Sequence, residues 1–182
     1  MDGFLVIAIT PPFSFPMEAE RINDLLIKGE ADFVHIRKPD SSAEEIENLI
    51  QLINPEFYPK LKLHDHFEIL DKYPLGGIHL NSRNKIPHSK AKSKSASIHS
   101  LDEIKLMESM DYFFFSPVYD SISKPGHNPS FKLQEIKDFI SGKRAIALGG
   151  VTPDKFPELK SVGFVGAALL GHFFHQFQQK NN

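Results

Sequence analysis

The sequence contains no cysteine. This absence excludes a disulfide framework, a thiolate nucleophile and any metal site built on cysteine, and it leaves the redox compartment undetermined. An excess of basic residues is also missing, because 21 lysines and arginines are balanced by 23 aspartates and glutamates and the formal net charge is −2. A broad positive surface for nucleic acid is therefore not expected, and any anion must be bound by locally placed positive charge.

Long hydrophobic segments are absent as well. The apolar run Phe4–Ile9 is shorter than the hydrophobic region of a signal peptide and follows no basic residues. The longest run, Val162–Phe174, is too short to span a bilayer and is interrupted by glycines and His172. We therefore expect no association with membranes and a cytoplasmic location.

The chain nevertheless has enough apolar residues to bury a substantial core, since 41% of its 182 residues are hydrophobic. No change of composition marks a boundary, so we expect residues 1–182 to form one compact domain. Short apolar runs without alternation predict strands that are buried on both faces, as in a parallel sheet covered by helices. The predicted strands are Gly3–Thr10, Asp32–Arg37, Lys60–His64, Gly76–Leu80, Lys94–Ile98, Asp111–Ser116, Arg144–Leu148 and Gly163–Leu170.

Helical patterns follow these runs, except that a mainly polar connection follows the fourth. Eight such units, with a helix barely present in the fourth, predict an α/β fold of the (β/α)8 TIM-barrel type. The alternative is an open doubly wound sheet, but Pro11-Pro12 replaces the glycine-rich turn that usually follows its first strand. The predicted helices are Met17–Lys28, a segment capped by Ser41 and Ser42, Phe67–Lys72, Leu101–Ser109, Phe131–Ile140, Pro153–Ser161 and Phe173–Gln179.

Three predicted strands end in residues that suit a phosphate group. Hydroxyl and ammonium groups follow the sixth strand, two adjacent glycines precede a helix start after the seventh, and the eighth ends at another glycine. Backbone N–H groups at a helix N-terminus bind anions, and TIM barrels often hold phosphate after strands seven and eight. The predicted phosphate-binding residues are Ser121, Ser123, Lys124, Gly149, Gly150, Leu170 and Gly171.

Histidine recurs at the ends of four successive strands, although any single one of these residues would more often be structural. Arg37 suits a second anion because a guanidinium group binds phosphate bidentately, and its alternative role is a salt bridge. Asp65 suits Mg²⁺, and its alternative role is to cap the following helix. His64 and His66 flank it, but this spacing is only weak evidence for a transition metal. The polar strand-end residues are His35, Arg37, His64, Asp65, His66, His79, Ser97, His99 and Ser116.

In this order, the segments resemble the thiamine phosphate synthase and TenI family throughout the chain. The resemblance implies that the phosphate-binding residues hold hydroxyethylthiazole phosphate. It also implies that Arg37 binds hydroxymethylpyrimidine pyrophosphate, that Asp65 holds Mg²⁺, and that Ser97 with His99 assists the leaving pyrophosphate. The matching segments are ADFVHIR, LKLHD, GGIHL, SIHSLDE, DYFFFSPVYDSISK, AIALGGVTPD and GFVGAALLG.

The departures from the family pattern fall on the pyrophosphate side. His35 stands where the synthases have glutamine, Pro39 where they have lysine, and His64 where they have asparagine. The second carboxylate for magnesium is replaced by Asn84 or is absent, and Lys38 is the cation nearest to the lost lysine position. These changes weaken charge neutralisation of the leaving group and affinity for the metal.

Three functions therefore remain open. A synthase would use Arg37, Ser97, His99 and Lys124 as catalytic residues, with His35 and His64 at the pyrimidine substrate. A TenI-like thiazole tautomerase would use histidines as acid and base, although Pro117 stands where TenI has histidine. A non-catalytic protein that binds thiazole phosphate or thiamine phosphate is the third. The expected partners are phosphorylated thiazole and pyrimidine molecules, and a homo-oligomer stays open because the last helix suits packing on the barrel or on a second subunit.

Overall fold

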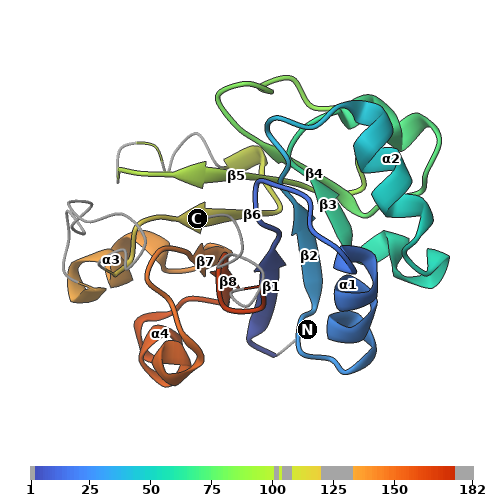
Figure 1. The fold of residues 1–182 in the computed structure, drawn as a ribbon. Helices are drawn as coiled ribbons and strands as arrows, with labels where there is room; N and C mark the ends of the chain where they lie inside the picture. Colours follow the sequence, from blue (N-terminus) through green and yellow to red (C-terminus); the bar gives the residue numbers. More distant parts are fainter. Residues whose placement is uncertain (1–2, 101–102, 104–107, 120–132, 175–182) are drawn as a thin grey trace. The chain divides into compact units, whose positions relative to one another are not determined.

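The computed structural model describes residues 3–100, 103, 108–119 and 133–174 (Figure 1). Its eight strands form a closed barrel in which β1 to β8 follow one another in chain order. The pairs from β1 to β4 and from β5 to β8 are parallel. This architecture confirms the predicted (β/α)8 TIM barrel. The strands are β1 (Leu5–Ile9), β2 (Phe33–Ile36), β3 (Leu61–Leu63), β4 (Gly77–Leu80), β5 (Lys94–Ile98), β6 (Tyr112–Phe115), β7 (Ala145–Ala147) and β8 (Gly166–Leu169).

The described residues fall into two compact units. The N-terminal unit comprises Ile7–Lys94 and the residues from Leu170 onward, and the C-terminal unit comprises the residues up to Val6 together with Ser95–Leu169. The N-terminal unit contains α1 (Glu18–Ile27), α2 (Ala43–Gln51), η1 (Pro55–Lys60) and η2 (Phe67–Asp71), and the C-terminal unit contains α3 (Leu133–Ile140), η4 (Pro153–Lys155) and α4 (Phe156–Val162).

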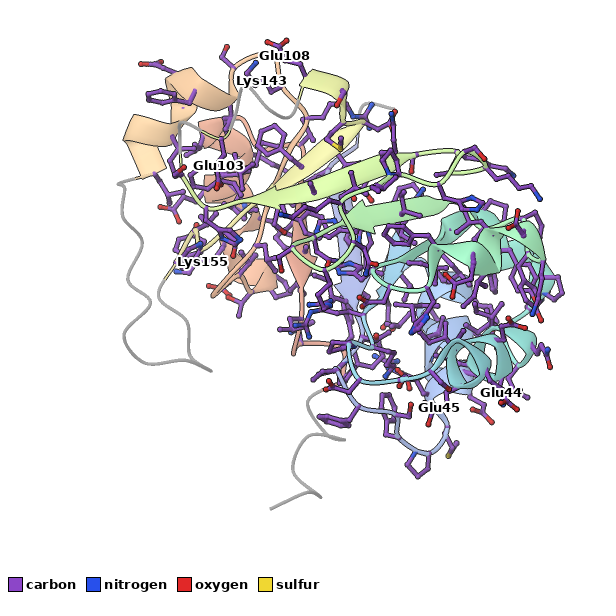
Figure 2. The ribbon with its side chains drawn as sticks, turned by 90° about the horizontal axis from the view of Figure 1, so that it is seen from above. Glu44, Glu45, Glu103, Glu108, Lys143 and Lys155 are labelled. Carbon is purple, nitrogen blue, oxygen red and sulfur yellow. The ribbon has the colours of Figure 1, made fainter. Side chains whose placement is uncertain are left out.

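In the N-terminal unit, the α-helices bury one apolar face, and Ile22 of α1 and Ile50 of α2 are completely buried. The start of α2 follows from a capping box formed by Ser42 and Glu45. The Ser42 hydroxyl accepts a hydrogen bond from the Glu45 N–H at 3.2 Å, and the Glu45 carboxylate accepts one from the Ser42 N–H at 2.7 Å. Figure 2 shows Glu45 at this helix.

Two connections in this unit differ in detail from the sequence patterns. The helix predicted over Phe67–Lys72 is the 3-10 helix η2, and η1 is a second 3-10 helix that the patterns did not predict. Proline at position 59 accounts for η1, because it lacks the N–H group that would donate to the Pro55 carbonyl in a continuous α-helix. No helix occurs among residues 81–93, all of which are described, and this agrees with the predicted polar connection between β4 and β5.

In the C-terminal unit, an apolar cluster joins the strands to the helices, with Phe113, Phe115, Ile136 and Leu159 among its buried members. The helix predicted over Pro153–Ser161 is divided into η4 and α4. Proline at position 157 cannot donate to the carbonyl of Pro153, so a continuous α-helical ladder is interrupted there.

Two further predicted helices, Leu101–Ser109 and Phe173–Gln179, lie largely outside the described residues. Of the helices that are described, none has the length and apolar character needed to cross a membrane.

Candidate functional site

Three histidines of the N-terminal unit share one face of the sheet. His35 lies on β2, His64 follows β3 directly, and His79 lies on β4. Side chains alternate between faces along a strand, and the buried Val34 and Ile78 take the opposite face. The exposed fractions of His35, His64 and His79 are only 0%, 5% and 2%. The strand ends therefore bring together two predicted site residues and a third histidine.

The three imidazole rings are in direct contact. His35 Nδ1 lies 2.9 Å from His64 Nε2. The His64 and His79 rings are stacked with centroids 4.2 Å apart, and the His35 and His79 centroids are 5.5 Å apart. Burial, which removes hydration from the charged form, lowers the pKa of His79 to about 3 and holds the pKa values of His35 and His64 well below the ordinary value. All three rings are therefore neutral near pH 7.

Arg37 follows β2 and is only partly buried. Its backbone N–H donates to the Thr10 hydroxyl at 3.0 Å, which fixes the chain at the end of the strand. Its positive charge contributes to the lowered pKa values of His64 and His79, so the guanidinium lies near these rings. Within the described residues, no side-chain hydrogen bond or ion pair engages this guanidinium, which leaves it suited to bind an anion.

Lys38, the neighbouring cation, has a different role. Its side chain is 1% exposed, and Nζ lies 2.7 Å from a carboxylate oxygen of Glu18. The same ammonium donates to the carbonyl oxygens of Pro11 at 3.0 Å and Phe13 at 2.6 Å. Burial lowers the pKa of Lys38 and raises the pKa of Glu18, while their mutual attraction opposes both shifts. Lys38 therefore anchors the loop before α1 and does not replace the lysine that is missing at Pro39.

Asp65 is buried, and both of its carboxylate oxygens accept hydrogen bonds. Arg83 donates from Nε to Oδ1 at 3.0 Å and from Nη2 to Oδ2 at 3.1 Å. Asn84 Nδ2 donates to Oδ1 at 2.8 Å. The helix-capping alternative is not supported, because His66 is the N-cap of η2 and its ring lies 2.8 Å from the Ser41 carbonyl oxygen.

This arrangement around Asp65 does not fit Mg²⁺. Magnesium needs oxygen ligands in near-octahedral geometry, usually including carboxylates. Here the carboxylate is already held by a cation, Arg83, and Asn84 presents its amide nitrogen to the same carboxylate. A dication beside this guanidinium would be repelled, so the charge next to Asp65 is supplied by the arginine.

Arg83 and Asn81 are the members of this network that the sequence patterns did not identify. Asn81 Nδ2 donates to the His64 carbonyl oxygen at 2.5 Å. Its Oδ1 accepts from the backbone N–H groups of Arg83 at 3.0 Å and Asn84 at 3.2 Å. The only signal in the sequence is a run of side-chain amides and an arginine directly after β4.

In the C-terminal unit, Ser97 is partly buried on β5 and His99 is exposed just beyond it. His99 Nδ1 lies 2.9 Å from the Ser116 carbonyl oxygen, so Nδ1 carries the proton in a neutral ring and Nε2 keeps its lone pair. The Glu103 carboxylate, labelled in Figure 2, accepts from the backbone N–H groups of His99 at 2.6 Å and Ser100 at 3.3 Å. These bonds fix the loop that carries His99.

The glycine turn after β7 also lies in this unit. Gly149 and Gly150 have φ values of +92° and +64°, which favour glycine. A Cβ on Gly149 would meet Cα of Pro117 at 2.9 Å, so the two chain segments approach closely. Tyr119 N–H donates to the Gly149 carbonyl at 3.1 Å, whereas neither glycine N–H donates within the described part of the chain. Two backbone donors therefore remain for an anion.

The other predicted phosphate-binding residues are less fully defined. Leu170 and Gly171 follow β8 in the N-terminal unit, where the Gly171 carbonyl accepts from Phe174 N–H at 3.2 Å. Ser121, Ser123 and Lys124 lie outside the described residues.

A cavity of about 310 Å³ lies at the other ends of the C-terminal strands. It is lined by residues that precede β6 and β7, among them Asp111 and Arg144, and by Glu108 and Lys143, which Figure 2 labels. TIM barrels carry their chemistry at the C-terminal ends of the strands, so this cavity is separate from the candidate site.

Several known proteins similar to this chain are named thiamine phosphate synthase or thiamine phosphate pyrophosphorylase. The model of a family described as thiamine monophosphate synthase matches residues 6–173. A crystal structure of thiamine phosphate pyrophosphorylase from Bacteroides thetaiotaomicron is 32% identical, with a TM-score of 0.84 over 98% of this chain and 89% of that chain. The thiamine-phosphate synthase of a Synechococcus species is 29% identical over 142 residues, which are 72% of this chain and 40% of that protein. That of Bacteroides fragilis is 23% identical over 166 residues, 81% of each chain. The chain thus spans less than half the length of its Synechococcus relative.

Proposed function

The chain belongs to the thiamine monophosphate synthase family, and we propose on this basis that it makes thiamine phosphate. The substrates are hydroxymethylpyrimidine pyrophosphate and hydroxyethylthiazole phosphate. The bond between the pyrimidine methylene carbon and the pyrophosphate oxygen breaks, and its electron pair leaves with pyrophosphate. The thiazole nitrogen then supplies the pair for the new carbon–nitrogen bond.

The observation that carries this proposal is the guanidinium of Arg37 at the end of β2, beside the buried histidines, which no side chain of the described residues engages. A pyrophosphate bound there would receive bidentate hydrogen bonds, and these strengthen as negative charge develops on the leaving group. Arg83 supplies a second positive charge near the His64 ring. Charge neutralisation then depends on two arginines, and His35 and His64 lie on the pyrimidine side of the substrate.

The thiazole phosphate is assigned to the glycine turn of the C-terminal unit. The N–H groups of Gly149 and Gly150 suit a phosphate oxygen, and Ser121, Ser123 and Lys124 keep the role that the family resemblance gives them. Leu170 and Gly171 retain the same predicted role. Ser97 supplies a hydroxyl to the departing pyrophosphate, and His99 supplies Nε2, the ring nitrogen that its bond to Ser116 leaves available.

A tautomerase is not favoured. The three relatives described above are named as synthases or pyrophosphorylases. Pro117, which stands at the TenI histidine position, has no titratable group for proton transfer. The cytoplasmic location, the single domain and the homo-oligomer expected from the sequence stay predictions.

The test is pyrophosphate release by the purified chain, measured with each substrate alone and with both together. We expect release only when both are present, and Arg37→Gln should abolish it while the chain stays folded. Absence of release, with thiazole phosphate still bound in a calorimetric titration, would contradict the synthase and leave a binding protein.

A further inference from the structure

The buried histidine cluster of His35, His64 and His79 offers more than the proposed reaction requires. One ring nitrogen from each residue lies within 4.8 Å of the other two, and all three side chains are buried. We propose that this cluster binds one divalent transition-metal ion, of which zinc is the reference ion, through one nitrogen of each ring. The inference goes beyond the proposed function, because it holds whether or not the chain is a synthase.

The spacing of the nitrogens is close to that of a three-histidine metal site. Tetrahedral zinc with Zn–N distances of 2.0–2.1 Å places its ligand nitrogens about 3.3 Å apart. The His35 and His64 nitrogens are 2.9 Å apart, slightly nearer than this, and the widest separation in the cluster is below 4.8 Å. To bind the ion, the first pair would separate by about 0.4 Å and His79 would move inward.

The scaffold holds the three rings firmly. They come from the ends of three consecutive parallel strands. Ile9 is paired with His35 across β1 and β2, and Leu63 is paired with Ile78 across β3 and β4. The backbone of His64 is further fixed by the amide of Asn81 on its carbonyl oxygen. Sites built on strands are positioned more precisely than sites on loops, so little ordering remains to be done on binding.

The donor set decides which ion fits. Three imidazoles present nitrogen and no carboxylate oxygen, a set that suits zinc, copper and nickel and does not suit magnesium or calcium. Burial keeps the rings neutral, which is the form that binds metal. This site is therefore distinct from Asp65, whose oxygens are held by Arg83 and Asn84.

Positive charge near the rings opposes the binding of a divalent metal ion that has no anionic ligand. Arg37 and Lys62 both lie close enough to lower pKa values within the cluster. Lys62 is tied by hydrogen bonds of 2.6 Å to the Gly76 carbonyl and the Ser93 hydroxyl, so it stays in place. These charges favour a site whose fourth ligand is an anion such as hydroxide.

The experiment measures metal binding by the full-length chain, independently of any substrate. The chain is stripped with chelator, dialysed against Zn²⁺ or Co²⁺, and assayed for bound metal and for the visible absorption of Co²⁺. We expect one ion per chain, intense tetrahedral Co²⁺ bands, and no competition from millimolar Mg²⁺. Absence of stoichiometric metal would overturn the proposal, and it would leave the synthase assignment to be judged by pyrophosphate release.

Variants assign the ligands. His64→Asn and His79→Asn should each weaken zinc binding by more than the about 10- to 100-fold that loss of an outer partner of a metal ligand typically costs. The matched control is His66→Asn, because that ring lies against the Ser41 carbonyl and Glu68, outside the cluster. Circular dichroism tests whether each variant is folded. If His64→Asn or His79→Asn is not folded, His35→Gln takes its place as the test of a ligand. Equal loss in the His66 variant would show surface binding and overturn the site.

Discussion

Arg83 holds the carboxylate of Asp65 through two parallel hydrogen bonds of 3.0 and 3.1 Å. In this bidentate geometry, the guanidinium occupies the position that a metal ion would take beside the carboxylate. The family resemblance implies that Asp65 holds Mg²⁺, whereas in this structure its carboxylate forms an internal ion pair. Its dependence on magnesium should differ accordingly.

Arg83→Gln tests this relationship. Loss of the guanidinium frees the Asp65 carboxylate, so pyrophosphate binding should weaken without metal and be partly restored by Mg²⁺. A charge-assisted hydrogen bond contributes about 1.5–3 kcal/mol, which predicts at least about tenfold weaker binding in chelator. Calorimetric titration of pyrophosphate with and without Mg²⁺ measures both effects. Lys85→Gln, which removes a charge from the same loop, is the control, and strict Mg²⁺ dependence of the unmodified chain would contradict the prediction.

The buried pair of Glu18 and Lys38 predicts a stability effect. Glu18→Gln leaves a buried ammonium without its carboxylate, and breaking such a pair costs about 3–5 kcal/mol. The double variant Glu18→Gln, Lys38→Met removes both charges and should recover much of that loss. Denaturant unfolding gives the free energies. If Lys38→Met weakened pyrophosphate binding without changing stability, the anchoring role would be wrong.

The Gly149 turn predicts a steric effect on ligand binding. Gly149→Ala places a methyl 2.9 Å from the Pro117 backbone at a φ of +92°, so the turn must move. We expect thiazole phosphate affinity to fall by about tenfold or more, which corresponds to about 1.4 kcal/mol.

Gly142→Ala is the matched control for Gly149, because Gly142 has a φ of +70° and its added Cβ meets nothing within 4 Å. It should cost roughly 1–2 kcal/mol of stability, because a residue with a Cβ is strained in the left-handed region, and it should leave binding unchanged. Equal effects of the two variants on binding would show that backbone conformation, and not the approach of Pro117, is responsible.

Lys124 carries the remaining prediction for the thiazole phosphate. Lys124→Ala should weaken the binding of phosphorylated thiazole by about tenfold or more, because a charge-assisted contact is lost. The binding of unphosphorylated thiazole should be almost unaffected. Competition binding with both ligands measures the difference, and Lys143→Ala, at the other ends of the strands, is the control. An equal loss for both ligands would remove the phosphate assignment.

Much of the fold was predictable because local signals agreed with it. Runs such as Tyr112–Phe115 are apolar without alternation, and this pattern is typical of strands buried on both faces. The start of α2 was predictable from Ser42 and the acidic residues that follow it. The division of the helix predicted over Pro153–Ser161 was not predicted from its apolar spacing, although proline at position 157 is its cause.

The site was predictable in its residue types but not in its pairings. That His35 and His64 end neighbouring strands can be read from the sequence, but their 2.9 Å contact depends on strand register. The partner of Asp65 is 18 residues away, and its position depends on how one short loop folds. Lys38 shows the same limit, because its partner Glu18 belongs to a different segment.

The amide of Asn81 joins the carbonyl of His64 to the backbone of the loop that carries Arg83 and Asn84. One small side chain thus fixes the histidine strand end and the arginine loop against each other. A change in the length of residues 81–84 would disturb both at once, whereas a substitution at Arg83 alone would not. Relatives that diverged here would be expected to have changed the whole loop together, and engineering of the site should replace it as a single cassette.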